Sequence, residues 1–158
     1  NPTAIFGELV REGQRVADVG CGGGFFSLAL ARMVGPEGKV ISIDVQPEML
    51  NRVRNRARRR GLDQVIDLRL CEADRLGLEE PLDFVLSFWM AHEVADQEGF
   101  LTEIRSALEP SGILLLAEPR VHVPASRLQE TVDTARGVGF DVAAGPEVRF
   151  SRSILCSP

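Results

Sequence analysis

Short apolar segments of strand length alternate with longer amphipathic segments along this chain of 158 residues. This alternation is typical of a parallel β-sheet covered by helices, because a helix must carry the chain back before each new parallel strand. The expected strands are 15–19, 40–43, 66–70, 84–88, 113–118, 140–144 and 151–156. The expected helices are 25–33, 47–60, 98–108 and 125–138, with a short leading helix near residues 4–10.

The last two expected strands are separated only by residues 145–150. A parallel crossover needs about a dozen residues or more, so these strands should form an antiparallel hairpin. The sequence therefore predicts an α/β fold with a doubly wound, seven-stranded sheet that is mostly parallel and ends in an antiparallel hairpin. We expect a single domain over residues 1–158, with a crevice where the chain reverses at the carboxyl ends of the strands.

The charge and hydropathy of the chain exclude several classes of protein. The net charge of −5 argues against a general nucleic-acid or membrane binder. The longest apolar run, Ile113 to Ala117, is too short for a membrane-spanning helix, which needs about 20 residues. The first residues lack the basic and apolar regions of a signal peptide, so a cytoplasmic location is expected.

The cysteines and histidines do not have the spacing of a metal site. No two cysteines form a Cys-x-x-Cys pair, and only His92 and His122 accompany them, so no metal is expected. The cysteines, which we expect to be reduced thiols, are Cys21, Cys71 and Cys156.

A glycine-rich turn connects the first expected strand to the first long helix. It has the pattern D-x-G-x-G-x-G, formed by Asp18, Gly20, Gly22 and Gly24. Glycines allow a ligand to approach the backbone closely, although a tight turn without a ligand is the alternative explanation. The dinucleotide pattern G-x-G-x-x-G is not completed, because its third glycine would fall at position 25 or 27.

The acidic residue and glycine spacing resemble the first motif of class I S-adenosylmethionine-dependent methyltransferases. The resemblance implies that the turn lies against the amino-acid part and ribose of S-adenosylmethionine. Asp44 ends the second strand 20 residues after Gly24, where a carboxylate can bind both ribose hydroxyls. NAD-binding proteins also bind the ribose hydroxyls with a carboxylate at this position. Asp44 alone therefore does not distinguish S-adenosylmethionine from NAD. Val45 would lie beside the adenine.

Two later segments also resemble this family. In the segment 71–74, Ala73 and Asp74 resemble the short acidic motif that meets the adenine amino group, although a loop carboxylate is usually only solvated. The segment 81–94 resembles the fourth strand and the turn that faces the methyl group, which implies cofactor contacts for Ser87 and Phe88. The resemblance covers essentially the whole chain and implies the strand order 3-2-1-4-5-7-6.

The end of the fourth strand also restricts the acceptor. It lacks the polar residue and Pro-Pro-Tyr of enzymes that methylate exocyclic amines or glutamine amides, and no Pro-Cys pair supplies a thiolate nucleophile. If the acceptor must lose a proton, His92 is the best candidate for a catalytic base, because imidazole can act near neutral pH. The alternative is a structural histidine. Glu93 and Glu118 are lesser candidates.

Six arginines lie within the expected helix 47–60, which first suggests a nucleic acid partner. However, Leu50, Val53 and Ala57 form the inward stripe, so the arginines occupy the solvated face. No aromatic residues interleave the arginines to stack on bases, and this argues against nucleic acid.

The favoured hypothesis is an enzyme that transfers a methyl group from S-adenosylmethionine to a small molecule. Within the superfamily the chain is most similar to small quinone-biosynthesis-like methyltransferases, and a monomer or homodimer is expected. The alternative is an S-adenosylmethionine-binding partner subunit, or a degenerate methyltransferase, without its own acceptor pocket. A nicotinamide-dependent dehydrogenase is the third hypothesis.

Overall fold

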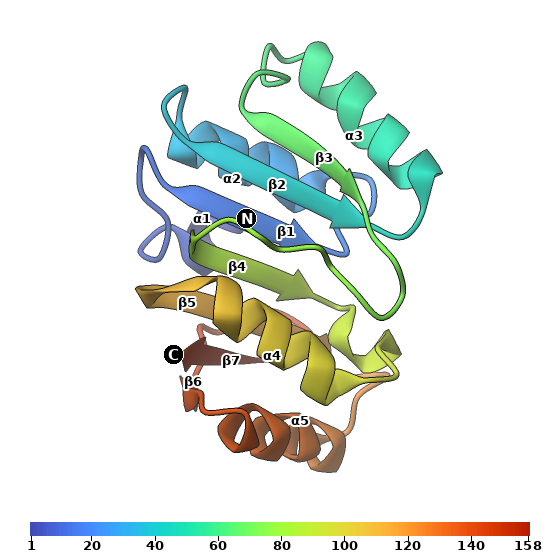
Figure 1. Cartoon of the computed structure of the whole chain (residues 1–158), viewed down its shortest axis with the longest axis vertical. Coiled ribbons are helices and arrows are strands. Elements are labelled where there is room, and N and C mark those ends of the chain that lie inside the picture. Colours follow the sequence, from blue (N-terminus) through green and yellow to red (C-terminus); the bar gives the residue numbers. More distant parts are fainter.

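All seven predicted strands are present in the computed structural model, which describes residues 1–158. They form one sheet in the order β3-β2-β1-β4-β5-β7-β6 (Figure 1), as predicted. The strands are β1 (Arg15–Val19), β2 (Lys39–Asp44), β3 (Ile66–Leu70), β4 (Leu82–Phe88), β5 (Leu108–Pro119), β6 (Asp141–Ala144) and β7 (Ser151–Ser157). The helices are α1 (Pro2–Phe6), α2 (Phe25–Val34), α3 (Pro47–Arg58), a 3-10 turn η1 (Ala91–Glu93), α4 (Gln97–Ala107) and α5 (Ala125–Gly137).

Strands β1 to β5 are parallel to one another, whereas β7 runs antiparallel to both of its neighbours, β5 and β6. The predicted hairpin is thus confirmed, and β7 is inserted between β5 and β6. This is a Rossmann-like α/β fold. The order in which strands are added to the sheet reverses between β1 and β4, and open parallel sheets bind ligands at this position.

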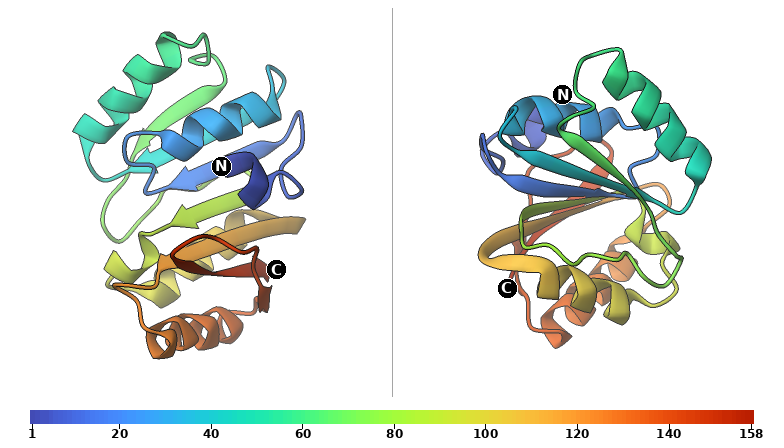
Figure 2. Two further views of the ribbon diagram at one scale, coloured as in Figure 1. Left: turned by 180° about the vertical axis from the view of Figure 1, so that it is seen from behind. Right: turned by 45° about the horizontal axis from the view of Figure 1, so that its top comes forward.

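Two hydrophobic cores cover the faces of the sheet, because alternate strand residues point to opposite faces. In β1, Val16 packs into the core under α1, α2 and α3, whereas Ala17 packs into the core under α4 and α5. Figure 1 shows α4 in front of the sheet and α2 behind it. The left view of Figure 2 shows the molecule from behind, with α2 in front of the sheet. No helix is long and apolar enough to cross a membrane.

The structure differs most from the sequence predictions at two places. The leading helix spans Pro2–Phe6 and not residues 4–10, because the Asn1 side chain caps it by accepting the Thr3 N–H and a proline occupies its first turn. The fifth strand begins at Leu108 and not at residue 113. Leu108 pairs with Leu82, and the register then shifts so that Ile113 pairs with Phe84, which makes the intervening residues a bulge.

Candidate functional site

A cavity of about 190 Å³ lies at the carboxyl ends of β1, β2 and β4, beside the start of α4. It is bounded by the end of β2, by the loop after β3, and by the segment from the end of β4 into α4. Six acidic residues and one arginine are among the lining residues, so the electrostatic potential there favours a cation. The lining residues include Gly20, Asp44, Val45, Ala73, Asp74, Trp89 and Glu103.

The glycine turn requires glycine for two different reasons. Gly24 has a φ of +80°, and a Cβ there would stand 2.8 Å from the Val53 side chain of α3, so this glycine allows close helix packing. Gly22 also has a positive φ, +49°, but a Cβ there would meet no atom of the chain within 4 Å. The space above Gly22 is therefore open to a ligand.

Asp44 connects the end of β2 to the glycine turn. Its Oδ2 accepts the backbone N–H of Gly22 at 2.9 Å, and its Oδ1 accepts that of Gln46 at 2.9 Å. The side chain is almost fully buried but lines the cavity. Because a carboxylate has about four acceptor positions, each oxygen retains a lone pair for a ligand hydroxyl.

Asp18 lies under the same turn and has almost no exposed surface. Its carboxylate accepts the Ser27 hydroxyl at 2.5 Å. Burial raises the pKa of Asp18 to about 6, because a carboxylate that loses its hydration favours the protonated form. Asp18 therefore holds the first turn of α2, and it does not line the cavity.

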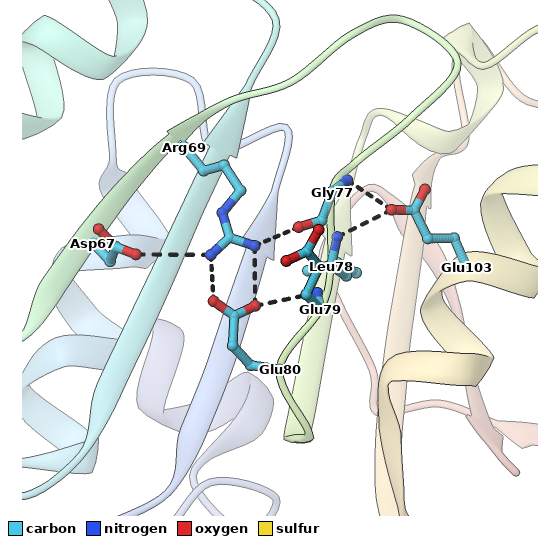
Figure 3. Close-up of polar contacts among 7 residues, drawn as sticks. All are labelled: Asp67, Arg69, Gly77, Leu78, Glu79, Glu80 and Glu103. Carbon is cyan, nitrogen blue, oxygen red and sulfur yellow. Dashed lines mark hydrogen bonds and ion pairs between the residues drawn. The ribbon is translucent and has the colours of Figure 1, made fainter.

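The loop after β3, residues 71–81, carries Ala73 and Asp74 into the cavity wall, and polar contacts hold it from two sides (Figure 3). From β3, the Arg69 guanidinium donates to the Gly77 carbonyl and forms a bidentate ion pair with Glu80. This contact lowers the pKa of Glu80 to about 2. From α4, the Glu103 carboxylate accepts the backbone N–H groups of residues 76, 77 and 78 at 2.9, 2.6 and 3.0 Å.

Replacing Glu103 with glutamine is expected to loosen this loop. The amide oxygen cannot replace both charged oxygens, so amide hydrogen exchange at residues 76–78 should become about tenfold faster, equivalent to about 1.5 kcal/mol. Glu98→Gln on the same helix is the matched control, because Glu98 is exposed and forms no side-chain hydrogen bond. Equal exchange in both variants would contradict the proposed role of Glu103.

Aromatic side chains extend from α2 to the cavity. Phe26 packs against Phe88 with ring centroids 4.4 Å apart, and Phe88 packs against Trp89 at 5.4 Å. Trp89 has a φ of +60°, which is rare for a bulky residue. Its backbone N–H donates to Ala117 O at 2.8 Å and its Nε1 donates to Ser151 Oγ at 2.8 Å, so both ends of the residue are held. The half-exposed indole forms part of the cavity wall.

His92 lies in the 3-10 turn on the β5 side of the cavity. Its Nδ1 is 2.5 Å from Glu118 Oε2, and its backbone N–H donates to Glu118 Oε1 at 3.1 Å. Glu118 is buried near the end of β5, and burial raises the pKa of its carboxyl group. The two residues therefore form a fixed pair, which the sequence did not predict although both were named as candidates.

The predicted site residues divide into two groups. The structure brings Gly20, Asp44, Val45, Ala73 and Asp74 together around the cavity. The remaining residues lie outside its lining, in the turn or the strands beneath it: Asp18, Gly22, Gly24, Ser87, Phe88 and His92. Of these, Ser87 has no exposed surface, and its hydroxyl has no hydrogen-bond partner.

Sequence reasoning did not single out Glu103. The spacing from Asp96 to Glu103 matches no recognisable motif. Only the folded structure shows that Glu103 accepts backbone N–H groups of the loop after β3.

Comparisons with known proteins agree with this geometry. Residues 11–142 match a family model described as a methyltransferase domain. The chain is 37% identical over 105 residues to a ubiquinone biosynthesis O-methyltransferase of Cereibacter sphaeroides, covering 66% of this chain and 40% of that protein. It is 32% identical over 112 residues to a demethylmenaquinone methyltransferase of Geobacillus stearothermophilus, covering 69% and 47%. The chain thus spans less than half the length of these curated relatives.

A solved structure is similar over nearly all of the chain. The crystal structure of a SAM-dependent methyltransferase from Aquifex aeolicus has a TM-score of 0.86 and 25% sequence identity, covering 99% of this chain and 88% of that one.

Proposed function

This chain belongs to the methyltransferase-domain family, and we propose that it binds S-adenosylmethionine in the cavity and transfers its methyl group to a small-molecule acceptor. The observation that carries the proposal is the Asp44 carboxylate, which lines the cavity while it holds the open glycine turn at Gly22. The quinone-biosynthesis methyltransferases among its relatives support a small acceptor.

The residues present fit this cofactor. Asp44 would accept the ribose hydroxyls, Val45 and Ala73 would contact the adenine, and Asp74 would accept its amino group. Gly20 and Gly22 would face the ribose and the amino-acid part of the cofactor, and Gly24 would keep the turn against α3. When bound, S-adenosylmethionine supplies an electrophilic methyl group on a positively charged sulfur.

The acidic lining would favour this positive charge, and Asp18 would add to the negative potential under the turn. Ser87 and Phe88 would act indirectly, by packing beneath the turn that carries Trp89 and His92. Trp89 would form the wall between the cofactor and the acceptor, and exclude water from it.

Further parts of the proposal concern partners and location. We propose a monomer or homodimer in the cytoplasm that does not act on nucleic acid. The free cysteines fit a reducing compartment. The exposed arginines of α3 fit a solvated helix face, since Leu50, Val53 and Ala57 of the same helix are buried in the core.

Replacing Gly22 with alanine is expected to weaken cofactor binding about tenfold, because its methyl group would enter the open space that the cofactor occupies. Gly61→Ala is the matched control, since Gly61 has a φ of +65° and also has no atom within 4 Å of a Cβ. Both variants should lose about 1 kcal/mol of stability from the positive φ. If titration with S-adenosylhomocysteine gives equal affinities for the two, the cofactor does not pass Gly22.

Methyl transfer itself is tested with radiolabelled S-adenosylmethionine and a metabolite extract. We expect label in a small-molecule fraction, and competition by excess S-adenosylhomocysteine. If the protein binds the cofactor but labels nothing in extracts from several sources, the alternative of a binding subunit without its own acceptor pocket replaces the enzyme.

A further inference from the structure

A second hollow, of about 550 Å³, lies on the face of the sheet that α1, α2 and α3 cover. The left view of Figure 2 shows α1 and α2 on that face. The hollow is lined by α2, by α3 and by the start of α1, and it shares no residue with the cavity at the carboxyl ends of the strands. Three arginines line it: Arg32 of α2, Arg56 of α3, and Arg60, which follows α3. We call it the arginine hollow.

The three arginines of this hollow have no counter-charge. None of them forms an ion pair within the chain, and no carboxylate lines the hollow, although the chain as a whole has a net charge of −5. The electrostatic potential in the hollow therefore favours an anion. The cavity at the strand ends, with its six acidic residues, favours a cation. The two places thus select ligands of opposite charge.

Each guanidinium group is held in place by a main-chain carbonyl. Arg32 Nη1 donates to Leu28 O at 3.2 Å, within α2. Arg60 Nη1 donates to the carbonyl of Arg56 at 3.3 Å, and Arg56 Nη1 donates to Gly23 O at 2.6 Å. These are the only hydrogen bonds that the three guanidinium groups form within the chain, so the Nε and Nη2 donors of each remain free. A planar pair of N–H donors matches two oxygens of a phosphate group.

The α2 side of the hollow is apolar. Phe25 is 64% exposed, which is unusual for a large apolar side chain. Its ring contacts the edge of Phe26, with centroids 5.0 Å apart, and this contact supports the ring from one side. Leu28, Ala29 and Met33 continue the apolar lining along α2. A ligand with a negatively charged group and an apolar part would use both sides of the hollow.

We propose that the arginine hollow binds a small phosphate monoester, with its phosphate group on the three guanidinium groups and its apolar part on Phe25. A phosphate monoester carries about two negative charges at neutral pH and has three terminal oxygens, so it can accept hydrogen bonds from all three arginines. A carboxylate has one charge and two oxygens, and would leave donors of the hollow without a partner. This inference is independent of the proposed methyl transfer.

Titration of the protein with phenyl phosphate, followed by ¹H–¹⁵N nuclear magnetic resonance, tests the site directly. We expect saturable binding that moves the backbone amide signals of Phe25 and Arg60, which line the hollow, and leaves those of Val45 and Asp74 in the other cavity unchanged. No saturable binding at millimolar phenyl phosphate, or signal changes confined to the other cavity, would overturn the proposal.

Arginine variants separate a defined site from general attraction of anions. Arg32→Gln and Arg60→Gln should each weaken phenyl phosphate binding about tenfold, because each removes a charged donor. Arg58→Gln is the matched control, since it removes the same charge from an exposed position of α3 outside the hollow. Equal losses in all three variants would overturn the proposal. Arg56 is left unchanged, because it also holds the glycine turn at Gly23.

Two further ligands test the apolar part and the source of the phosphate. Phenyl phosphate should bind about fivefold more tightly than inorganic phosphate, and Phe25→Ala should remove this preference. No preference in the wild type would overturn the role of Phe25. Binding to phosphatidylglycerol vesicles or to an RNA oligonucleotide, without saturable binding of phenyl phosphate, would assign the arginines to a macromolecular surface and overturn the proposal. Because no cofactor is present in these titrations, their failure would leave the proposed methyl transfer intact.

Discussion

Replacing Asp18 with asparagine is expected to remove a pH dependence of about 3 kcal/mol from the free energy of unfolding. Burial raises the pKa of Asp18 from 3.8 to about 6 in the folded protein. Between these values the folded state binds more protons than the unfolded state, so this carboxyl group makes the protein less stable as the pH rises. Above pH 6 Asp18 is ionised in both the folded and the unfolded state, so the cost of burying its carboxylate lowers the free energy of unfolding in full.

Urea unfolding of the wild type and Asp18→Asn between pH 3.5 and 8 measures this effect. The other titrating groups contribute equally to both proteins, so the difference in stability isolates Asp18. The variant keeps an oxygen for the Ser27 hydroxyl. The free energy of unfolding of the variant, relative to that of the wild type, should increase as the pH rises from 3.8 to about 6. A difference that does not change with pH would show that Asp18 titrates normally.

Asp44→Ala is expected to weaken S-adenosylhomocysteine binding by about 1.5–3 kcal/mol, or roughly ten- to a hundredfold. The ribose hydroxyls lose a charged acceptor, and the Gly22 and Gln46 N–H groups lose the carboxylate that orders the turn. Calorimetric titration of the folded variant measures the loss.

Asp83→Ala is the matched control for this substitution. Asp83 accepts the backbone N–H of Arg15 at 2.8 Å, at the start of β1 and away from the cavity. The Asp83→Ala variant should lose a comparable backbone contact but bind S-adenosylhomocysteine with wild-type affinity. Wild-type affinity in a folded Asp44→Ala protein would remove Asp44 from the site.

The sequence was sufficient to predict the strands and helices, because their periodicity is a local property, whereas the order of the strands followed from the family resemblance. Even the reversed last hairpin followed from the short segment 145–150. The bulge at the start of β5 was not predicted, because Leu108 looked like the end of a helix until it was paired with Leu82 of another strand. The residues at which helices and strands begin and end depend on such tertiary pairing.

About half of the candidate site was predictable for a similar reason. Gly20 follows β1, Asp44 ends β2 and Asp74 lies in the loop after β3, and the carboxyl ends of parallel strands meet at one edge. Glu103 reaches backbone groups 25 to 27 residues away, and no local pattern encodes that contact. The Glu118 contact to His92 likewise joins the end of β5 to the 3-10 turn after β4, which only the folded sheet brings together.

Calorimetric titration of the wild-type protein with S-adenosylhomocysteine, and separately with NAD, tests the central claim that the cavity binds S-adenosylmethionine. The glycine spacing and the open space above Gly22 predict saturable binding of S-adenosylhomocysteine at one site per chain and no saturable binding of NAD. A folded protein that binds NAD and not S-adenosylhomocysteine, or that binds neither, would contradict the account.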